Sequence, residues 1–287
     1  MSELVVPPEA ISTETYWDFN GVPLQTYAWN VETWGPEREG VIPLRGENVK
    51  IPHTPGALWV PKMPDSRVIP LAMWVIGSNP DGTIRDRDVW ESNWRALRRL
   101  FWQPRRQFQL TKRWRNDNGE LVTATALAQY SGGMQPEATV DLDHAVFTVD
   151  LLLADPWFYG PAGAPHHLDL PDTPSIVIPA AGDDVTRRIT VDLTGPLDSP
   201  TLTNTTREPN VWLRYGASIL DSEHVVLDVE AWKATAFTAG GPVKAIGNVS
   251  HSGSYPWLEI GPEETTLVLS AQSGTGFADV TVVPVYQ

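Results

Sequence analysis

The sequence predicts a mainly β protein with two domains. The chain has 287 residues, among them 26 prolines, 22 glycines and 13 tryptophans. Many turn-forming residues together with many aromatic residues are typical of short strands joined by turns. Short runs of alternating apolar and polar residues recur along the chain, and one segment has helical periodicity. The length accommodates two domains of ordinary size.

The first third of the chain predicts a hairpin, an extended arm and a buried strand. Asn20-Gly21 lies between two alternating segments within residues 15–29, which is a strong hairpin signal. Prolines recur from Pro36 to Pro70 too often for a helix interior or for central strands. We therefore expect an extended arm or edge structure there, followed by a buried strand at Leu71–Gly77.

A single amphipathic helix is predicted at about residues 89–102. Asp88 is the expected N-cap, with Glu91 three positions later forming a capping-box pair. Arg98 and Arg99 lie in the last turn, where the helix dipole favours cations. At 100° per residue, one face holds Val89, Trp90, Trp94, Ala96, Leu97, Leu100 and Phe101, and the other holds Glu91, Ser92, Arg95, Arg98, Arg99 and Trp102.

Strands are predicted on the carboxyl side of this helix. Residues 106–114 and 120–132 form a second predicted hairpin, and residues 144–160 a strand that ends at Asp155-Pro156. We place an N-terminal domain at residues 1–160, a linker at 161–180 and a C-terminal domain at 181–287. The short alternating runs of the last segment predict a β-sandwich or jelly roll.

Several classes of activity have no support in the sequence. The chain has no cysteine, which excludes disulfides, thiolate metal sites and cysteine nucleophiles. The six histidines show no metal-ligand spacing, and neither a serine-hydrolase elbow nor a phosphate-binding loop is present. We therefore expect no catalytic residues, no metal and no cofactor. Neither a secretory signal nor a run long enough to span a bilayer is visible, so we expect a soluble protein without a membrane partner.

The basic residues are concentrated in one part of this acidic chain. Residues 85–115 contain ten basic and three acidic residues, so this window carries +7 against −21 for the rest. Such a run is often simply a solvated face. The alternative is a surface that binds nucleic acid, a membrane or a neighbouring subunit. The low pI argues against nucleic acid as the partner. The surrounding strands need the apolar face of the helix, which argues against a membrane surface.

A subunit interface is the hypothesis that we favour for this surface. A basic patch in an acidic background suits self-association, and exposed tryptophan beside arginine is enriched at interfaces. The predicted interface residues are Arg95, Arg98, Arg99 and Trp102 of the helix, with Trp59 and Met63 of the proline-rich arm.

Taken together, the chain resembles the distal tail proteins (Dit) of long non-contractile-tailed phages, the siphovirus-type tail component family. The resemblance runs from about Glu32 to the C-terminus and rests on the order and spacing of several segments. These are Leu44–Trp59, Leu71–Gly77 before the helix, Phe147–Gly160 with its Asp-Pro and aromatic residues, and Thr194–Thr206.

The resemblance implies an N-terminal β-sandwich or split-barrel domain with one α-helix and an extended arm, and a C-terminal galectin-like β-sandwich. It also implies a structural virion protein, made in the host bacterial cytoplasm, of which six copies form a ring in the tail tip. Such a ring connects the tail tube to the tail-tip or baseplate proteins of the adsorption apparatus, and DNA passes through its lumen without specific binding.

An alternative function is carbohydrate binding for host-surface recognition. Tryptophan-rich β-sandwiches commonly stack sugars on exposed rings, and Trp212, Trp232 and Trp257 are the candidates here. About half of the positions on an alternating strand point inward, so core packing is the competing role for each ring.

Overall fold

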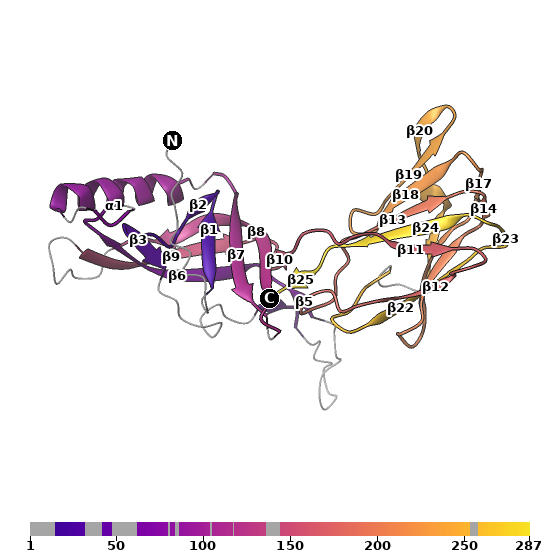
Figure 1. Ribbon diagram of the computed structural model, residues 1–287, viewed down its shortest axis with the longest axis horizontal. Helices are drawn as coiled ribbons and strands as arrows, with labels where there is room; N and C mark the ends of the chain where they lie inside the picture. Colours follow the sequence, from indigo (N-terminus) through magenta and orange to yellow (C-terminus); the bar gives the residue numbers. More distant parts are fainter. Residues whose placement is uncertain are drawn as a thin grey trace, which may run out of the picture. The chain divides into compact units, whose positions relative to one another are not determined.

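The structure is a computed structural model that divides into two compact units, residues 1–158 with Gln287 and residues 159–286. It describes residues 15–31, 42–47, 62–79, 81–83, 86–103, 105–116, 118–135, 144–252 and 258–287. The predicted mainly β fold is confirmed, with α1 (Arg87–Phe101) as the one α-helix of the described residues (Figure 1). The two units are described separately below.

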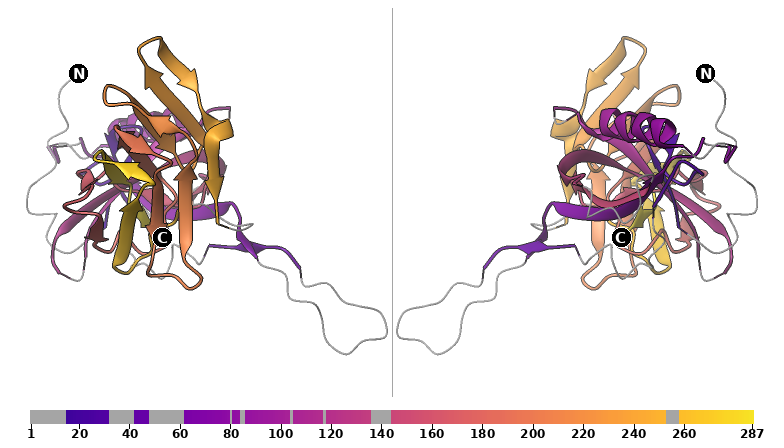
Figure 2. Two further views of the ribbon diagram at one scale, coloured as in Figure 1. Left: turned by 90° about the vertical axis from the view of Figure 1, so that its right-hand side faces the viewer. Right: turned by 90° about the vertical axis from the view of Figure 1, so that its left-hand side faces the viewer.

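The first unit is built on an antiparallel sheet with the strand order β2-β1-β7-β8-β9-β6-β3. Its strands are β1 (Tyr16–Phe19), β2 (Val22–Pro23), β3 (Trp29–Val31), β6 (Arg67–Ile76), β7 (Phe108–Arg115), β8 (Leu121–Gly133) and β9 (His144–Leu153), and β10 (Phe158–Tyr159) pairs with β8. Helix α1 lies across one face of this sheet (Figures 1 and 2).

Both predicted hairpins of this unit are confirmed. In the first, Phe19 pairs with Val22, and Asn20 and Gly21 both have positive φ (52° and 74°), as a two-residue hairpin turn requires. In the second, β7 pairs with β8 around a turn in which the Asn116 side-chain oxygen accepts hydrogen bonds from the backbone N–H groups of Asn118 and Glu120. Residues within each turn therefore account for its formation.

The described ends of the proline-rich segment are extended, as predicted, but the strand that follows begins earlier than predicted. These ends form a two-stranded sheet, in which β4 (Leu44–Arg45) pairs with β5 (Met63–Pro64). Strand β6 begins at Arg67, four residues before the predicted strand, and contains Pro70, which lies opposite Asp150 of β9. A proline is accepted there because β3 pairs with β6 only at Met73–Val75, so Pro70 has a partner strand on one side only, as at a sheet edge. The remainder of the arm, including Trp59, lies outside the described residues.

Strand β6 is apolar on both of its faces. Ile69, Leu71, Met73 and Val75 are buried in the core. The alternate positions are also apolar and are partly or largely exposed: Val68, Pro70, Ala72, Trp74 and Ile76. Buried strands covered on both faces have this pattern, whereas a half-buried strand alternates apolar with polar residues.

A buried carboxylate of β1 pairs with a partly exposed arginine of β7 in the same sheet. Asp18 of β1 is only 6% exposed, and the Arg113 guanidinium of β7 lies 2.6 Å from its carboxylate. Burial raises the pKa of Asp18 in spite of this partner. The Tyr16 ring packs under the same guanidinium at 5.3 Å, and burial together with the Asp18 charge raises the pKa of Tyr16 to about 12.

The raised pKa of Tyr16 predicts a stability loss at high pH. The folded-state pKa of about 12 lies above the unfolded value of 10.0, so the contribution of Tyr16 is complete below pH 10 and is lost as the pH rises toward 12. Tyr16→Phe cannot ionise and should lose less stability over that interval. Urea unfolding followed by tryptophan fluorescence would measure both proteins, and a difference that stays constant from pH 10 to 12 would contradict the assignment.

The second unit is a β-sandwich, as predicted. A six-stranded sheet has the order β11 (His166–Asp169), β24 (Phe277–Val282), β13 (Ile189–Thr194), β18 (His224–Asp228), β19 (Lys233–Thr238) and β20 (Gly241–Lys244). A five-stranded sheet has the order β12 (Ser175–Ile178), β22 (Thr265–Ser270), β15 (Thr201–Asn204), β16 (Val211–Tyr215) and β21 (Val249–His251). Smaller elements are β14 (Leu197–Asp198), β17 (Ser218–Ile219), β23 (Ser273–Gly274), β25 (Val285–Tyr286) and the 3-10 helix η3 (Ile246–Asn248).

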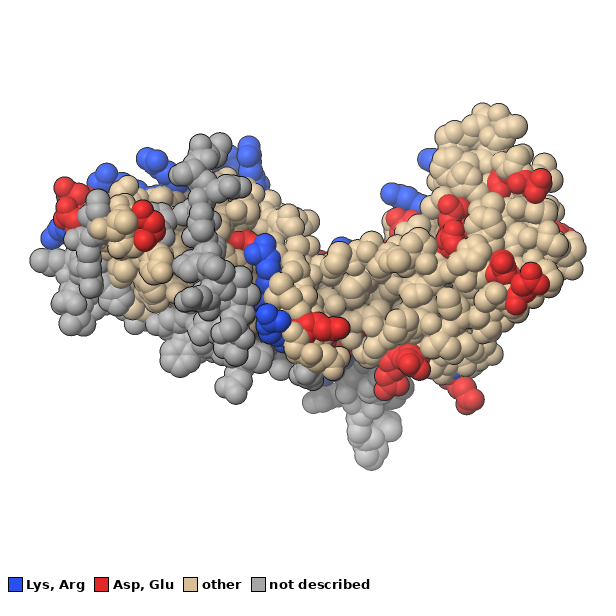
Figure 3. All heavy atoms as spheres, viewed as in Figure 1, with Lys and Arg blue, Asp and Glu red and all other residues tan. Residues whose placement is uncertain are grey.

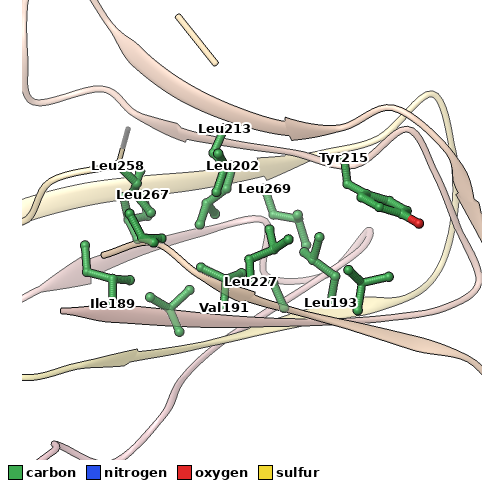
Figure 4. Packing of buried hydrophobic residues seen from close by; sticks show 14 of the residues in the cluster. Ile189, Val191, Leu193, Leu202, Leu213, Tyr215, Leu227, Leu258, Leu267 and Leu269 are labelled. Carbon is green, nitrogen blue, oxygen red and sulfur yellow. The ribbon is translucent and has the colours of Figure 1, made fainter. Parts of the chain in front are cut away.

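The core of this unit lies between the two large sheets. Ile189, Val191 and Leu227 of the six-stranded sheet face Leu202, Leu213, Leu267 and Leu269 of the five-stranded sheet (Figure 4). All seven side chains are less than 5% exposed. The alternating runs of the sequence thus form strands that place one face in this core.

The predicted linker at residues 161–180 is wrong. This segment contains β11 and β12, one in each large sheet, and Leu168 and Ile178 belong to the buried core of the second unit. The chain divides between Phe158 and Tyr159 instead. The many prolines of this segment predicted a loop, but its two strands have only four residues each and fit between the prolines.

A buried carboxylate ties three segments of the second unit together. The Glu259 side chain is only 5% exposed, and its two oxygens contact Arg187 at 2.9 Å and Arg207 at 2.6 Å. The Asn204 side chain donates a hydrogen bond to the Glu259 backbone carbonyl at 2.8 Å. Residues 258–260 end one of the short alternating runs of the sequence but make only one isolated bridge, between Ile260 and Thr186. These side-chain contacts stabilise the segment in place of a ladder.

Candidate interface on helix α1

Helix α1 begins two residues earlier than predicted. It spans Arg87–Phe101, its N-cap is Asp86 with extended backbone, and Trp102 is the C-cap. The Asp86 side chain makes no capping hydrogen bond. Because the helix begins at Arg87, the predicted N-cap at Asp88 and its capping box with Glu91 are both wrong. Asp88 instead lies in the first turn, and Arg98 and Arg99 lie in the last turn as predicted. Both placements are favourable to the helix dipole.

The helix is attached to the sheet by one apolar face. Leu97 and Phe101 are fully buried, and the Phe101 ring packs against Phe19 of β1 at 5.0 Å. Trp90 and Trp94 stack in parallel at 6.2 Å, and Trp94 meets Phe147 of β9 edge-on at 4.9 Å. Both tryptophans were predicted to pack in the core; they are half-buried, and Trp94 reaches the sheet through Phe147. Ala96, predicted on this face, is exposed.

Asn93 is a second attachment that the sequence pattern did not reveal. Its amide is buried and donates hydrogen bonds to the backbone carbonyls of Ile76 at 3.0 Å and Ser78 at 2.7 Å. These two carbonyls lie where β6 ends. Asparagine has poor helix propensity, so its position between two apolar turns was the available signal of a tertiary role.

The opposite face of α1 and the turn after it carry a surface that we call the arginine surface. It consists of the side chains of Arg95, Arg98, Arg99, Trp102, Arg105 and Arg106. All six are exposed, and Trp102 is 63% exposed. Arg95 pairs with Glu91 at 3.0 Å, one turn before it. Within the described part of the chain, no carboxylate pairs with Arg98, Arg99, Arg105 or Arg106. Blue side chains gather over α1 in Figure 3.

Two shallow hollows meet at Trp102. One, of about 360 Å³, is lined by Arg95, Arg98, Arg99 and Trp102, and the other, of about 260 Å³, by Trp102, Gln103, Arg105 and Arg106. The Trp102 ring contacts Tyr130 of β8 at 5.5 Å, which supports it against the sheet. The structure thus brings four of the predicted interface residues together, and Arg105 and Arg106 were not in the predicted set.

Met63 and Trp59 are not part of this surface as described. Met63 lies in β5, is 39% exposed and lines neither hollow. Trp59 lies outside the described residues. A role for the arm in subunit contact remains a prediction.

The candidate sugar-binding tryptophans do not form an exposed platform in the described part of the chain. Trp212 and Trp232 are both half-buried, and Trp232 packs against the sandwich core and edge-on to His251 at 5.6 Å. Trp257 lies outside the described residues. Both described rings are thus partly covered by the sandwich, whereas stacking on a sugar uses an exposed ring face.

The described residues contain no cluster of three or more histidine or acidic side chains placed to hold a metal ion. None of the described helices is long and apolar enough to cross a membrane.

Comparison with known proteins identifies the fold. No protein-family model and no curated protein sequence matches the chain. Among solved structures, the chain is similar to the Dit protein of phage SPP1, with a TM-score of 0.59 over 94% of this chain and 98% of that one. The chain has the Dit fold.

Sequence identity to the SPP1 Dit protein is 14%, so the likeness concerns the fold. That protein is described as a paradigm of the hub adsorption apparatus in phages that infect Gram-positive bacteria. Two structures of the phage P2 baseplate, in its activated conformation with Ca and with Sr, also match, with identities of 8% and 7% and TM-scores of 0.39 and 0.38. These matches cover 93% of this chain and 98% and 97% of those chains.

Proposed function

We propose that this chain is a structural hub protein of a phage tail tip. The observation that carries the proposal is the Dit fold, shared over nearly the whole length of both chains. In this proposal six copies form a ring that joins the tail tube to the tail-tip or baseplate proteins of a long non-contractile-tailed phage. The ring has a structural role in the virion, binds no cofactor and lets DNA pass through its lumen.

The two units suit different parts of such an assembly. The first unit carries both the arginine surface and the apolar outer positions of β6, which are the kinds of surface that self-association covers. The second unit is a closed sandwich with its own core. We assign these surfaces of the first unit to contacts between copies in the ring. The second unit is then open both to neighbouring copies and to other tail-tip proteins.

The location in the virion tests the hub function. Antibodies against the purified protein, labelled with gold, should bind one end of the tail in electron micrographs of the phage that encodes it. Mass spectrometry of purified virions should detect the chain as well. Absence from purified virions, with the protein present in the infected cell, would exclude a hub.

The ring itself is tested separately. Light scattering on the purified protein should give six times the 31.7 kDa of one chain. A stable mass of two or three chains would contradict the hexamer while leaving a tail-tip location open.

A further inference from the structure

The arginine surface has the side-chain types of a protein-binding site, but most of its arginines lack a carboxylate partner within the described residues. Within the described residues, four of its five arginines have no carboxylate partner, and its tryptophan is largely exposed. Tryptophan and arginine are the residues most enriched among those that dominate binding energy at interfaces. The planar guanidinium donates paired hydrogen bonds to a carboxylate, and Trp102 at the junction of the two hollows supplies apolar area to bury.

The chain itself supplies a surface of opposite charge. Residues 159–286 contain 15 acidic and six basic residues. Three of the six, Arg187, Arg188 and Arg207, are already paired with Glu259 and Glu230. Most carboxylates of the second unit therefore have no basic partner among the described residues of that unit, and acidic side chains are spread over its face in Figure 3.

We propose that the arginine surface binds carboxylates on the second unit of another copy of this chain. This inference names the partner surface within the proposed ring and rests on that function for its biological setting. A heterologous contact of this kind, repeated from copy to copy, closes a ring. The charge difference also steers copies into the correct orientation before they touch.

Nucleic acid is the competing occupant, because arginine and tryptophan also stack on bases. The chain carries a net charge of −14, which repels a polyanion at long range. The same net charge does not oppose a contact between a local basic patch and an acidic unit of a second copy.

The first experiment is a matched pair of charge reversals. Arg98→Glu with Arg99→Glu should weaken self-association about tenfold or more, measured by sedimentation velocity over a concentration series. Arg87→Glu with Arg115→Glu changes the net charge equally at two exposed sites of the first unit, outside the arginine surface, and should leave self-association intact. Arg98→Ala with Arg99→Ala provides a variant without new charge, and circular dichroism checks the fold of all three.

The second experiment identifies the partner surface. Arg98→Lys with Arg99→Lys keeps the charge and adds two primary amines, which a carbodiimide joins directly to contacting carboxylates. In a mixture of ¹⁴N- and ¹⁵N-labelled copies, mass spectrometry should find mixed-isotope cross-links from these amines to acidic residues of 159–286. Cross-links confined to one copy, or to residues 1–158 of a second copy, would overturn the proposal.

The remaining outcomes also decide the question. A protein that stays monomeric at its highest soluble concentration, or a charge reversal that assembles like the parent, would overturn the proposed contact. Binding of a single-stranded oligonucleotide that the reversal abolishes, with assembly unchanged, would assign the surface to nucleic acid. These results are independent of virion location, so failure of the contact and failure of the hub function are distinguishable.

Discussion

Phe101→Ala is expected to lower the free energy of unfolding by about 3–5 kcal/mol. The Phe101 side chain is fully buried at the end of α1, and its ring packs on Phe19 of β1 at 5.0 Å. Removing the ring loses its transfer free energy and leaves a cavity between the helix and the sheet. Neighbouring rings cannot close this space without moving the helix.

Urea unfolding would measure the free energy of unfolding, and hydrogen exchange would show which unit loses stability. Peptides from residues 15–158 should lose protection in Phe101→Ala, because the substitution acts on the core of that unit. Arg99→Ala, two positions away on the exposed face, should change stability by no more than about 0.5 kcal/mol. Equal losses in the two variants would show that α1 is not anchored through Phe101.

Glu259→Ala is expected to cost the second unit about 2–3 kcal/mol. The substitution removes a buried carboxylate that accepts from two arginines at 2.9 and 2.6 Å, and hydrogen bonds to charged groups contribute more than neutral ones. The cost stays below that of a fully buried pair, because the Arg187 and Arg207 side chains are 44% and 43% exposed and regain water.

The control for this prediction is Glu263→Ala. Glu263 is exposed four residues further along the chain, and its substitution should shift the unfolding midpoint little. Thermal unfolding of both variants by circular dichroism gives the comparison. A Glu259→Ala protein as stable as the Glu263→Ala protein would mean that residues 258–260 are held by their backbone alone.

The sequence was informative where structure is local. The turn at Asn20-Gly21 follows from the positive φ that both residues tolerate, and the inward positions of the sandwich strands follow from simple alternation. The start of α1 was misplaced because Asp86 and Asp88 are equally good N-cap residues by type. In the fold, the backbone N–H of Asp86 donates to the Gly77 carbonyl at 2.7 Å, which fixes the chain just before the helix.

Contacts between distant segments could not be predicted in this way. Asn93 bonds to carbonyls 15 and 17 residues earlier in the chain, and Glu259 pairs with arginines more than 50 residues away. Strands β11 and β12 were missed because each has four residues and prolines lie close to both of its ends. For the interface, charge and periodicity identified Arg95, Arg98, Arg99 and Trp102, but Arg105 and Arg106 join them only through the fold of the turn after α1.

The attachment of α1 through Asn93 bears on the entropy of association. Two hydrogen bonds to the end of β6, together with the buried Leu97 and Phe101, fix the rotation of the helix about its own axis. The backbone that carries the arginines is thus in its binding geometry before a partner arrives. Besides the translational and rotational freedom that every association loses, binding then restricts side-chain rotamers and not the helix backbone, and each restricted long side chain costs about 0.5–1.5 kcal/mol. A preorganised helix lets weak individual ion pairs sum to a stable contact.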